Sequence, residues 1–271
     1  MDKRIIFITG SGGGLGLELV IRLARMGHKV YAGSRNVDKL KKFLMRNKYE
    51  CNNLKVIKLD VAKENSVKNS INSILKQEGK IDILVNNASY GLVGAVENLE
   101  TNQIRDVLNV NLLGPVRCIK YTLPIMRRYN GGVIVNISSV SGIVASPFLG
   151  AYCASKFGLE GLTESLLAEL RKYNIRVVLV EPGMFKSNFI KNSKIKNDLK
   201  NNPYFYDVKN YLNSIKNLCR TKKVQNDNEV ADFIINNVIF AKGKEFRFQT
   251  DEWSKKVVGS KLKSNFLILK G

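Results

Sequence analysis

The sequence predicts an α/β fold in which helices cover both faces of a doubly wound parallel sheet. Two observations indicate it. Short apolar segments with the character of buried strands alternate with helical patterns along the chain. The first of these segments, residues 4–9, leads directly into the glycine-rich run 10–16, and a helical pattern begins at Leu15. Strand, glycine turn and helix in this order are typical of the first unit of such a sheet, whose parallel strands are joined by right-handed crossovers.

Seven strands and six helices are expected along the chain. The strands are assigned from short apolar runs, and the helices from apolar residues that recur every three or four positions. The strands should lie near residues 4–9, 29–34, 54–60, 81–86, 132–138, 175–181 and 245–249. The helices should lie near residues 14–26, 36–48, 63–78, 100–129 with a break around Gly114-Pro115, 150–173 and 228–241. The ligand crevice is expected at the carboxyl ends of the strands, where the strand order reverses.

Length and composition favour one globular domain over residues 1–271. Of the 271 residues, 44% are hydrophobic, so the chain can bury a substantial core. The first residues lead straight into the first strand, and no stretch approaches the roughly 20 apolar residues of a membrane span. We therefore expect a soluble, cytoplasmic protein. Four scattered cysteines without a Cys-x-x-Cys pair, and a single histidine, predict neither a disulfide framework nor a metal site.

The formal net charge of +21 raises the alternative of a nucleic-acid-binding protein. However, the lysines are spread along the whole chain, and no recognised nucleic-acid motif accompanies them. A compositional bias toward Lys and Asn explains the charge, so no specific nucleic-acid partner is expected.

Three side chains with complementary chemistry indicate a catalytic site. Tyr152 and Lys156 are four residues apart, and Ser139 lies thirteen residues before Tyr152. Positions i and i+4 share one face of a helix, so the phenol and the ammonium should lie close together. A neighbouring cation lowers the pKa of a tyrosine, which is about 10 in water, and so suits it to proton transfer near neutral pH. With Ser139 as a second hydroxyl at the same reacting oxygen, these residues indicate interconversion of a carbonyl and an alcohol.

The glycine-rich turn indicates a dinucleotide site. Glycine permits positive φ, close approach of the backbone to a pyrophosphate, and tight packing of the helix on the strand. The helix N-terminus then faces the phosphates. After the second strand, where an acidic residue would bind the ribose hydroxyls of NAD, the chain has Ser34 and Arg35. A guanidinium favours the 2′-phosphate, so NADP(H) is the preferred cofactor; Asp38 as a ribose partner would leave NAD(H) as the alternative.

The order and spacing of these motifs resemble those of the short-chain dehydrogenase/reductase family. The resemblance spans roughly residues 3–190 and is carried by Thr9-Gly10, Gly14, Gly16, Asn86-Asn87-Ala88, Asn111, Ser139, Tyr152, Lys156 and Pro182-Gly183. It implies a single-domain Rossmann fold and an NAD(P)-dependent oxidoreductase that acts on CH–OH groups. It also implies a homodimer or homotetramer that pairs the helices at 100–129 and 150–173.

The same resemblance implies roles for individual residues. Ser139 and Tyr152 would hydrogen-bond the carbonyl oxygen of the substrate, and Tyr152 would transfer its proton. Lys156 would lower the pKa of Tyr152 and bond the nicotinamide ribose, while Asn111 would hold a water on the proton relay. Asp60 matches an adenine-contacting aspartate, although a helix N-cap role fits it nearly as well. The implied cofactor contacts are Thr9, Gly10, Ser11, Gly14, Leu15, Gly16, Ser34, Arg35, Asp60, Val61, Asn87, Ala88, Tyr152, Lys156, Pro182, Gly183 and Ser187.

The substrate is predicted to be an apolar ketone or alcohol. The segment around Glu181-Pro182-Gly183 and the late run 246–250 resemble a branch that includes 17β-hydroxysteroid and retinol dehydrogenases, so a steroid- or retinoid-like molecule is implied. Residues 188–224 would form the substrate lid. A 3-oxoacyl carrier-protein reductase, whose acidic partner would suit the basic surface, and a non-catalytic nucleotide-binding protein are the alternatives. The expected substrate contacts are Tyr90, Val140, Ser141, Phe148, Leu149 and Met184.

Overall fold

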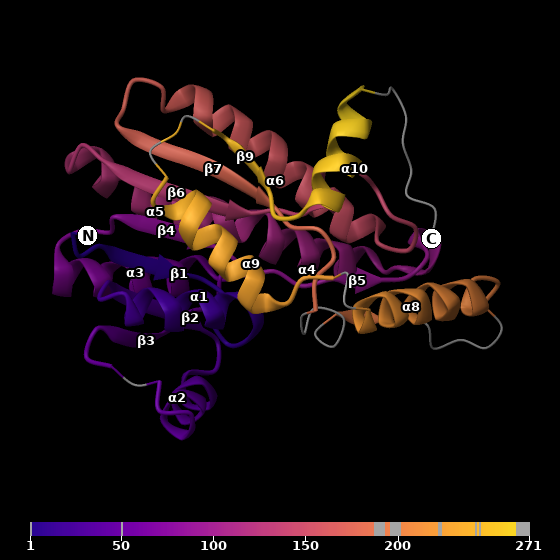
Figure 1. Cartoon of the computed structure of the whole chain (residues 1–271), viewed down its shortest axis with the longest axis horizontal. Coiled ribbons are helices and arrows are strands. Elements are labelled where there is room, and N and C mark those ends of the chain that lie inside the picture. The colour runs from indigo at the N-terminus through magenta and orange to yellow at the C-terminus, as the bar shows by residue number, and fades with distance from the viewer. Residues whose placement is uncertain are drawn as a thin grey trace.

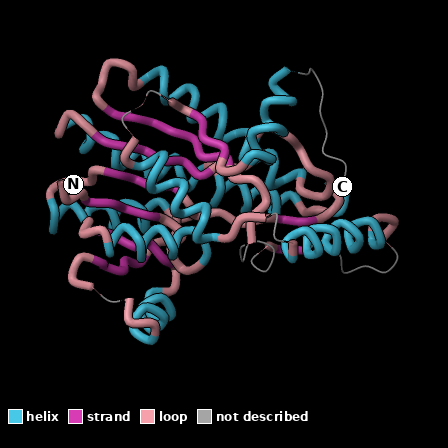
Figure 2. Tube along the Cα trace, in the orientation of Figure 1, coloured by secondary structure: helices cyan, strands magenta, loops and turns pink. Residues whose placement is uncertain are grey.

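The protein is built on a seven-stranded parallel sheet with helices on both faces, as predicted (Figures 1 and 2). The computed structural model describes residues 2–49, 51–186, 193–195, 202–221, 224–241, 243 and 245–263. Across the sheet the strands follow the order β3 (Leu54–Lys58), β2 (Lys29–Ser34), β1 (Ile5–Ile8), β4 (Ile83–Asn86), β6 (Gly132–Ile137), β7 (Ile175–Glu181) and β9 (Arg247–Gln249). The order reverses between β1 and β4, which is where a ligand crevice is expected in such sheets.

The helices divide between the two faces of the sheet. Alternate residues of one strand enter different cores: Ile6 and Ile8 of β1 belong to one apolar cluster, whereas Ile5 and Phe7 belong to the other. The first cluster includes α1 (Gly14–Arg25), α2 (Val37–Arg46) and α9 (Asp227–Ile234). The second includes α3 (Glu64–Glu78), α5 (Leu113–Arg128) and α6 (Gly150–Glu169), with α4 (Thr101–Asn111) packed on α5 and α6.

The long helix predicted over 100–129 is broken, but at Leu112 rather than at Gly114-Pro115. Both of these residues lie in the first turn of α5. Proline fits there because the first N–H groups of a helix have no partner within it. Gly114 packs closely on Val61, since a Cβ atom at this position would lie 3.0 Å from Val61 Cγ2.

Two helices and a small second sheet were not predicted. They are the helices α8 (Phe205–Arg220) and α10 (Glu252–Lys263), and a two-stranded parallel sheet of β5 (Leu92–Val93) and β8 (Lys194–Ile195). Helix α8 lies at one end of the molecule, away from the main sheet (Figures 1 and 2). The last predicted helix, 228–241, is α9 followed by a π-helical turn, Ile235–Ile239, whose carbonyl at Ile239 accepts a hydrogen bond of 2.9 Å from Arg176.

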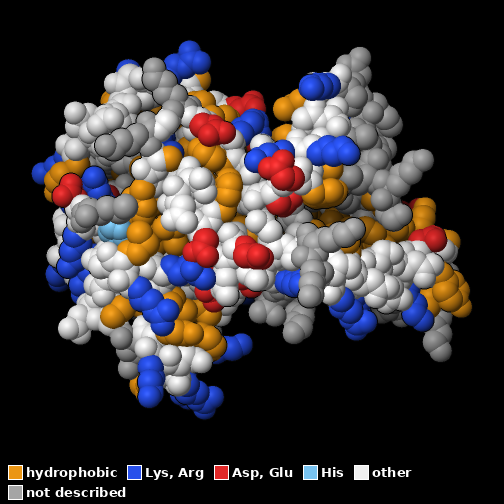
Figure 3. All heavy atoms as spheres, viewed as in Figure 1, with side chains coloured by type: hydrophobic (Ala, Val, Ile, Leu, Met, Phe, Trp, Pro, Cys, Tyr) orange, Lys and Arg blue, Asp and Glu red, His pale blue; other side chains and the backbone are white. Residues whose placement is uncertain are grey.

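None of the described helices is both long and apolar enough to cross a membrane. Lys and Arg side chains are scattered among apolar and acidic ones over the face drawn in Figure 3. This agrees with their even spread along the sequence.

Candidate active site

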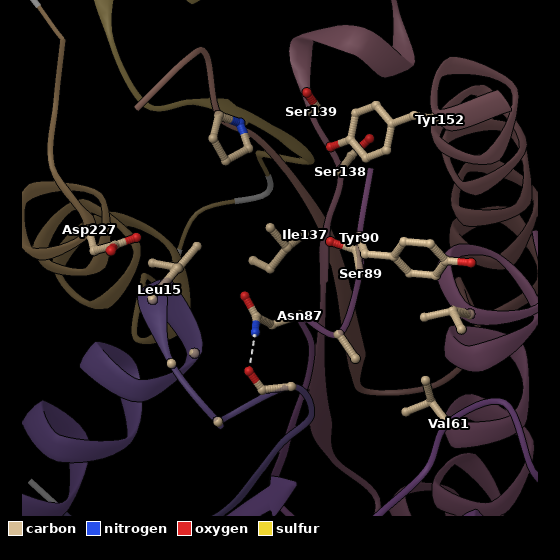
Figure 4. Close-up of a pocket in the computed structure, with 18 of the residues that line it drawn as sticks. Leu15, Val61, Asn87, Ser89, Tyr90, Ile137, Ser138, Ser139, Tyr152 and Asp227 are labelled. Atoms are coloured by element: carbon tan, nitrogen blue, oxygen red, sulfur yellow. Dashed lines mark hydrogen bonds between the residues drawn. The ribbon is translucent and has the colours of Figure 1, made fainter. Parts of the chain in front are cut away.

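A cleft of about 990 Å³ opens at the carboxyl ends of the strands. The segments that follow β1, β2, β4, β6 and β7 all contribute to its lining. Most of the predicted site residues therefore meet in one cavity (Figure 4). They are Gly10, Gly14, Leu15, Gly16, Ser34, Arg35, Asp60, Val61, Asn87, Ala88, Tyr90, Ser139, Val140, Ser141, Leu149, Tyr152, Pro182, Gly183 and Met184.

Hydrogen bonds of Asn87 and Thr9 connect the glycine turn to the segment that follows β4. Asn87 Nδ2 donates to the carbonyls of Thr9 and Gly10, at 3.0 and 3.2 Å, and Thr9 Oγ1 accepts from the backbone N–H groups of Asn87 and Ala88. A Cβ atom on Gly16 would lie 2.4 Å from Asn87 Nδ2, so only glycine fits. Thr9 and Ser11 are buried and do not line the cleft, and Ser11 donates to Ile8 O. Their structural role is to shape the turn.

The glycine turn leads directly into the N-terminus of α1, which begins at Gly14. Gly10 and Gly14 have φ of +70° and +56°, which favour glycine. A Cβ atom on Gly13 would meet nothing within 4 Å. The turn thus leaves space beside the N-terminal N–H groups of α1, which lack partners within the helix and are suited to an anion.

The end of β2 supplies positive charge to the same cleft. Ser34, Arg35 and Lys39 line it, and Arg35 is exposed. The backbone of Arg35 is fixed because Lys58 Nζ donates to its carbonyl at 2.7 Å. Asp38 does not line the cleft. Asp60 does, and its Oδ1 accepts from Ala62 N at 3.1 Å, so it also shapes the turn before α3.

The hydroxyl groups of Tyr152 and Ser139 face each other at the cleft wall (Figure 4). Tyr152 lies in the first turn of α6, and its hydroxyl is hydrogen-bonded to the side chain of Ser139, which follows β6. Lys156 lies one turn later on the same helix and is only 2% exposed. Its Nζ donates to Ile137 O at 2.7 Å and lies 5.8 Å from the centroid of the Tyr152 ring. The pair is therefore on one helix face, as predicted.

Burial dominates the electrostatics of this pair. It raises the pKa of Tyr152 above its ordinary value, and the hydrogen bond from Ser139 only partly offsets the effect. The sequence analysis predicted that Lys156 lowers this pKa, but the structure gives a raised pKa, with burial as the largest cause. Burial lowers the pKa of Lys156 to about 8, and the negative charge of Glu160 acts in the opposite direction.

Behind Lys156 lies a cluster of carboxylates around one guanidinium. Arg247 of β9 is paired with Glu160 and Glu164 of α6 and with Glu181 at the end of β7. Gln249 Nε2 also donates to Glu181 Oε2, at 2.7 Å. Burial and the neighbouring charge of Glu181 raise the pKa of Glu160 to about 7. The cluster thus connects α6, β7 and β9 through side-chain ion pairs.

Asn111 lies beside the cleft, at the last position of α4. It is buried; its Oδ1 accepts from Tyr90 N at 3.1 Å, and its Nδ2 donates to Tyr90 O at 2.9 Å and to Ser155 Oγ at 3.1 Å. Its side chain therefore joins the segment after β4 to helix α6. Its predicted role on a proton relay stays a prediction.

The apolar wall of the cleft differs in part from the prediction. Phe148 does not line it but packs on α8, with ring centroids 5.7 Å from Tyr211 and 6.4 Å from Tyr204. Tyr211 and Ile215 of α8 and Trp253 of α10 complete the wall. Ser187 lies outside the described residues, as do parts of the predicted lid, 188–224.

Comparison with known proteins identifies the family. The family model described as short chain dehydrogenase matches residues 4–198. The chain belongs to the short-chain dehydrogenase/reductase family. It is therefore an oxidoreductase, as the sequence predicted.

Several family members are similar to this chain. It is 34% identical to 3-ketodihydrosphingosine reductase of Bacteroides thetaiotaomicron over 80% of the chain and 76% of the relative. It is 41% identical to bovine retinol dehydrogenase 8 over 69% of the chain and 60% of the relative, and 38% identical to rat estradiol 17-beta-dehydrogenase 1 over 70% and 56%. The predicted resemblance to the retinol and 17β-hydroxysteroid branch is confirmed, although the matches span under two thirds of those two relatives. A short-chain dehydrogenase/reductase of Burkholderia phymatum, solved in complex with NAD, has a TM-score of 0.85 at 22% identity, covering 100% of this chain and 98% of that one.

Some of the residues that complete the site lie beyond the segment matched by the family model. Tyr211, Asp227, Arg247 and Trp253 all follow residue 198. Of these, Tyr211 lies in the predicted lid, 188–224, whereas the sequence analysis gave no site role to Asp227, Arg247 or Trp253, because their places depend on how the C-terminal elements pack on the family core. The proximity of Glu160 to Lys156 has a local signal in the sequence, since Glu160 lies one helical turn after Lys156.

Proposed function

We propose that the protein is an NADP(H)-dependent oxidoreductase that interconverts an apolar ketone and its alcohol. One observation carries this proposal: the hydroxyl groups of Tyr152 and Ser139 meet at the wall of a cleft that also contains the glycine turn and the N-terminus of α1. A proton donor and a dinucleotide cradle in one cavity are what carbonyl reduction requires.

The residues present fit a nicotinamide dinucleotide. The backbone of the glycine turn and the first N–H groups of α1 would hold the pyrophosphate, because a Cβ atom is excluded at Gly16 and the space above Gly13 is free. Asp60 and Val61 would flank the adenine, and Pro182 and Gly183 the nicotinamide. When bound, the dinucleotide supplies or accepts the hydride at the reacting carbon.

The remaining chemistry belongs to the side chains of this chain. Ser139 donates a hydrogen bond to the carbonyl oxygen of the substrate, and Tyr152 gives it a proton. The phenolate that remains is stabilised by the positive charge of Lys156, which stays protonated below about pH 8. The high pKa of Tyr152 keeps its proton in place until a substrate oxygen gains negative charge.

Two features support an apolar substrate. The cleft wall beside Tyr152 combines Val140, Leu149 and Met184 with Tyr211 and Ile215 of α8. The similar proteins are named for a ketosphingoid, retinol and estradiol, all of which are largely apolar molecules. We propose that α8, which belongs to the predicted lid, covers the apolar part of the substrate.

Replacement of Tyr152 by Phe tests the catalytic role. Turnover should fall by at least about a hundredfold, the typical effect of losing general acid catalysis, while cofactor affinity stays nearly unchanged. Steady-state assays and a cofactor titration measure the two effects. Tyr211→Phe, which removes a hydroxyl from the same cleft, is the matched control and should retain most activity. Near-normal turnover of Tyr152→Phe would contradict the proposal.

Replacement of Arg35 by Ala tests the cofactor preference. The dissociation constant for NADPH should rise by the equivalent of about 1.5 to 3 kcal/mol, as for a lost hydrogen bond to a charged group, with little change for NADH. Arg46→Ala, at the far end of α2, is a control that should change neither constant. Equal losses for both cofactors would show that Arg35 does not bind the 2′-phosphate.

A panel of carbonyl compounds tests the substrate class. Bulky apolar ketones should have a higher kcat/KM than short polar ones, because each Å² of apolar surface removed from water contributes about 25 cal/mol. Tyr211→Ala should lower kcat/KM for the bulky ketones roughly tenfold, for about 50 Å² of lost contact. Tyr206→Ala, whose residue is 70% exposed on the same helix, is the control. Preference for a short polar ketone, or for a carrier-protein thioester, would contradict an apolar pocket.

A further inference from the structure

A carboxylate lies at the N-terminus of the helix that should face the phosphates. Asp227, the first residue of α9, lines the cleft beside Leu15 (Figure 4). Its carboxylate accepts a hydrogen bond from the backbone N–H of Leu15. A Cβ atom on Gly14 would lie 3.5 Å from Asp227 Oδ1. The side chain thus occupies part of the space next to the glycine turn.

The scaffold holds Asp227 in this position. Asn226 caps α9: its Oδ1 accepts from Glu229 N at 3.0 Å, and Glu229 Oε2 accepts from Asn226 N at 2.8 Å. Helix α9 packs on α1 through the buried residues Val230 and Ala231. Because the cap fixes where α9 begins and the core fixes where it lies, Asp227 is directed toward the start of α1.

The surroundings of this carboxylate are unfavourable for negative charge. Its Oδ1 is buried and has no hydrogen-bond partner among the described residues. Burial, followed by the negative charge of Glu18 on α1, raises the pKa of Asp227 to about 6, and the Leu15 N–H acts in the opposite direction.

The other charged groups on the neighbouring elements do not neutralise Asp227. Arg22 of α1 is paired with Glu18 at 3.6 Å and with Asp232 of α9 at 2.5 Å. The glycine turn 10–14 has no charged side chain. Lys186 is the charged residue of the segment next to the start of α9, and its backbone pairs with Gln225 and Asn226.

We propose that Asp227 opposes binding of the dinucleotide pyrophosphate, so that cofactor affinity increases as the pH falls and this carboxylate is neutralised. The inference rests on the proposed function, which places the pyrophosphate at the start of α1. Two anions then compete for the same N–H groups, and the repulsion between them is strong in a partly buried site. Binding of the cofactor therefore requires Asp227 to take up a proton or to turn away.

The direction of the pH effect follows from proton uptake. Below about pH 6 the Asp227 carboxyl is neutral in the free protein, so binding meets no repulsion from it. Above that pH, the Asp227 carboxyl of the free protein is charged. Binding of the cofactor must then protonate this carboxyl or turn it away, and either step weakens the affinity. An Asp227→Asn variant lacks this charge at every pH.

The test is a titration of the full chain with NADPH at pH 5.5 and pH 8, followed by calorimetry or cofactor fluorescence. At pH 8, Asp227→Asn should bind NADPH about tenfold more tightly than the unsubstituted protein. At pH 5.5 the two proteins should differ much less. The 2′-phosphate of NADPH also titrates in this range, so the ratio between the two proteins at each pH is the quantity that reports on Asp227.

Two further variants complete the design. Asp232→Asn removes a carboxylate from the same helix, on its surface, and should reproduce the pH dependence of the unsubstituted protein. Asp227→Ser removes the charge with a smaller side chain and should behave as Asp227→Asn. Agreement between these two variants would show that the change in affinity comes from the lost charge and not from packing of the amide. Thermal unfolding verifies that each variant is folded.

The outcomes separate this inference from the proposed function. If the unsubstituted protein binds NADPH and neither Asp227 variant binds it more tightly at pH 8, the inference is wrong and the proposed function stands. If no variant binds a nicotinamide dinucleotide at either pH, both are wrong.

Discussion

The site depends on one buried positive charge. Transfer of an ammonium group from water to a protein interior is costly unless partners compensate it. Lys156 receives its compensation from the carbonyl of Ile137 at the end of β6 and from the negative charge of Glu160, one helical turn further along α6. Glu160 is in turn held by Arg247 of β9. Because these partners come from β6, α6 and β9, the charge can be buried only when the sheet is assembled, and catalytic geometry is thereby coupled to folding.

Two regions of the cleft balance charge in opposite ways. Around Lys156, a cation is kept beside the phenol of Tyr152, where it can stabilise a phenolate. At the start of α1, the carboxylate of Asp227 occupies a place suited to an anion, so an incoming pyrophosphate must overcome it. The first arrangement favours chemistry after binding, and the second limits binding itself. Together they would make the pH dependence of cofactor affinity separate from that of turnover.

The sequence predicted what depends on local spacing. The glycine turn after β1 and the pairing of Tyr152 with Lys156 follow from a few neighbouring residues, and both are present in the structure. What it did not predict depends on contacts between distant segments. The side chain of Phe148 turns toward α8 rather than lining the cleft, because the aromatic residues of α8 pack against it. The raised pKa of Tyr152 likewise reflects depth of burial, which four-residue spacing does not encode.

A direct titration of Lys156 tests the central claim. In the protein labelled with ¹³C at lysine Cε, one resonance should titrate near pH 8, well below the ordinary lysine value of 10.5, and should disappear in Lys156→Met. Glu160→Gln should move that resonance to a lower pKa, whereas Glu164→Gln, which removes the exposed member of the Arg247 cluster, should leave it in place. If all lysines titrate near 10.5, or if both substitutions act alike, the charge of Lys156 is not held as this account requires.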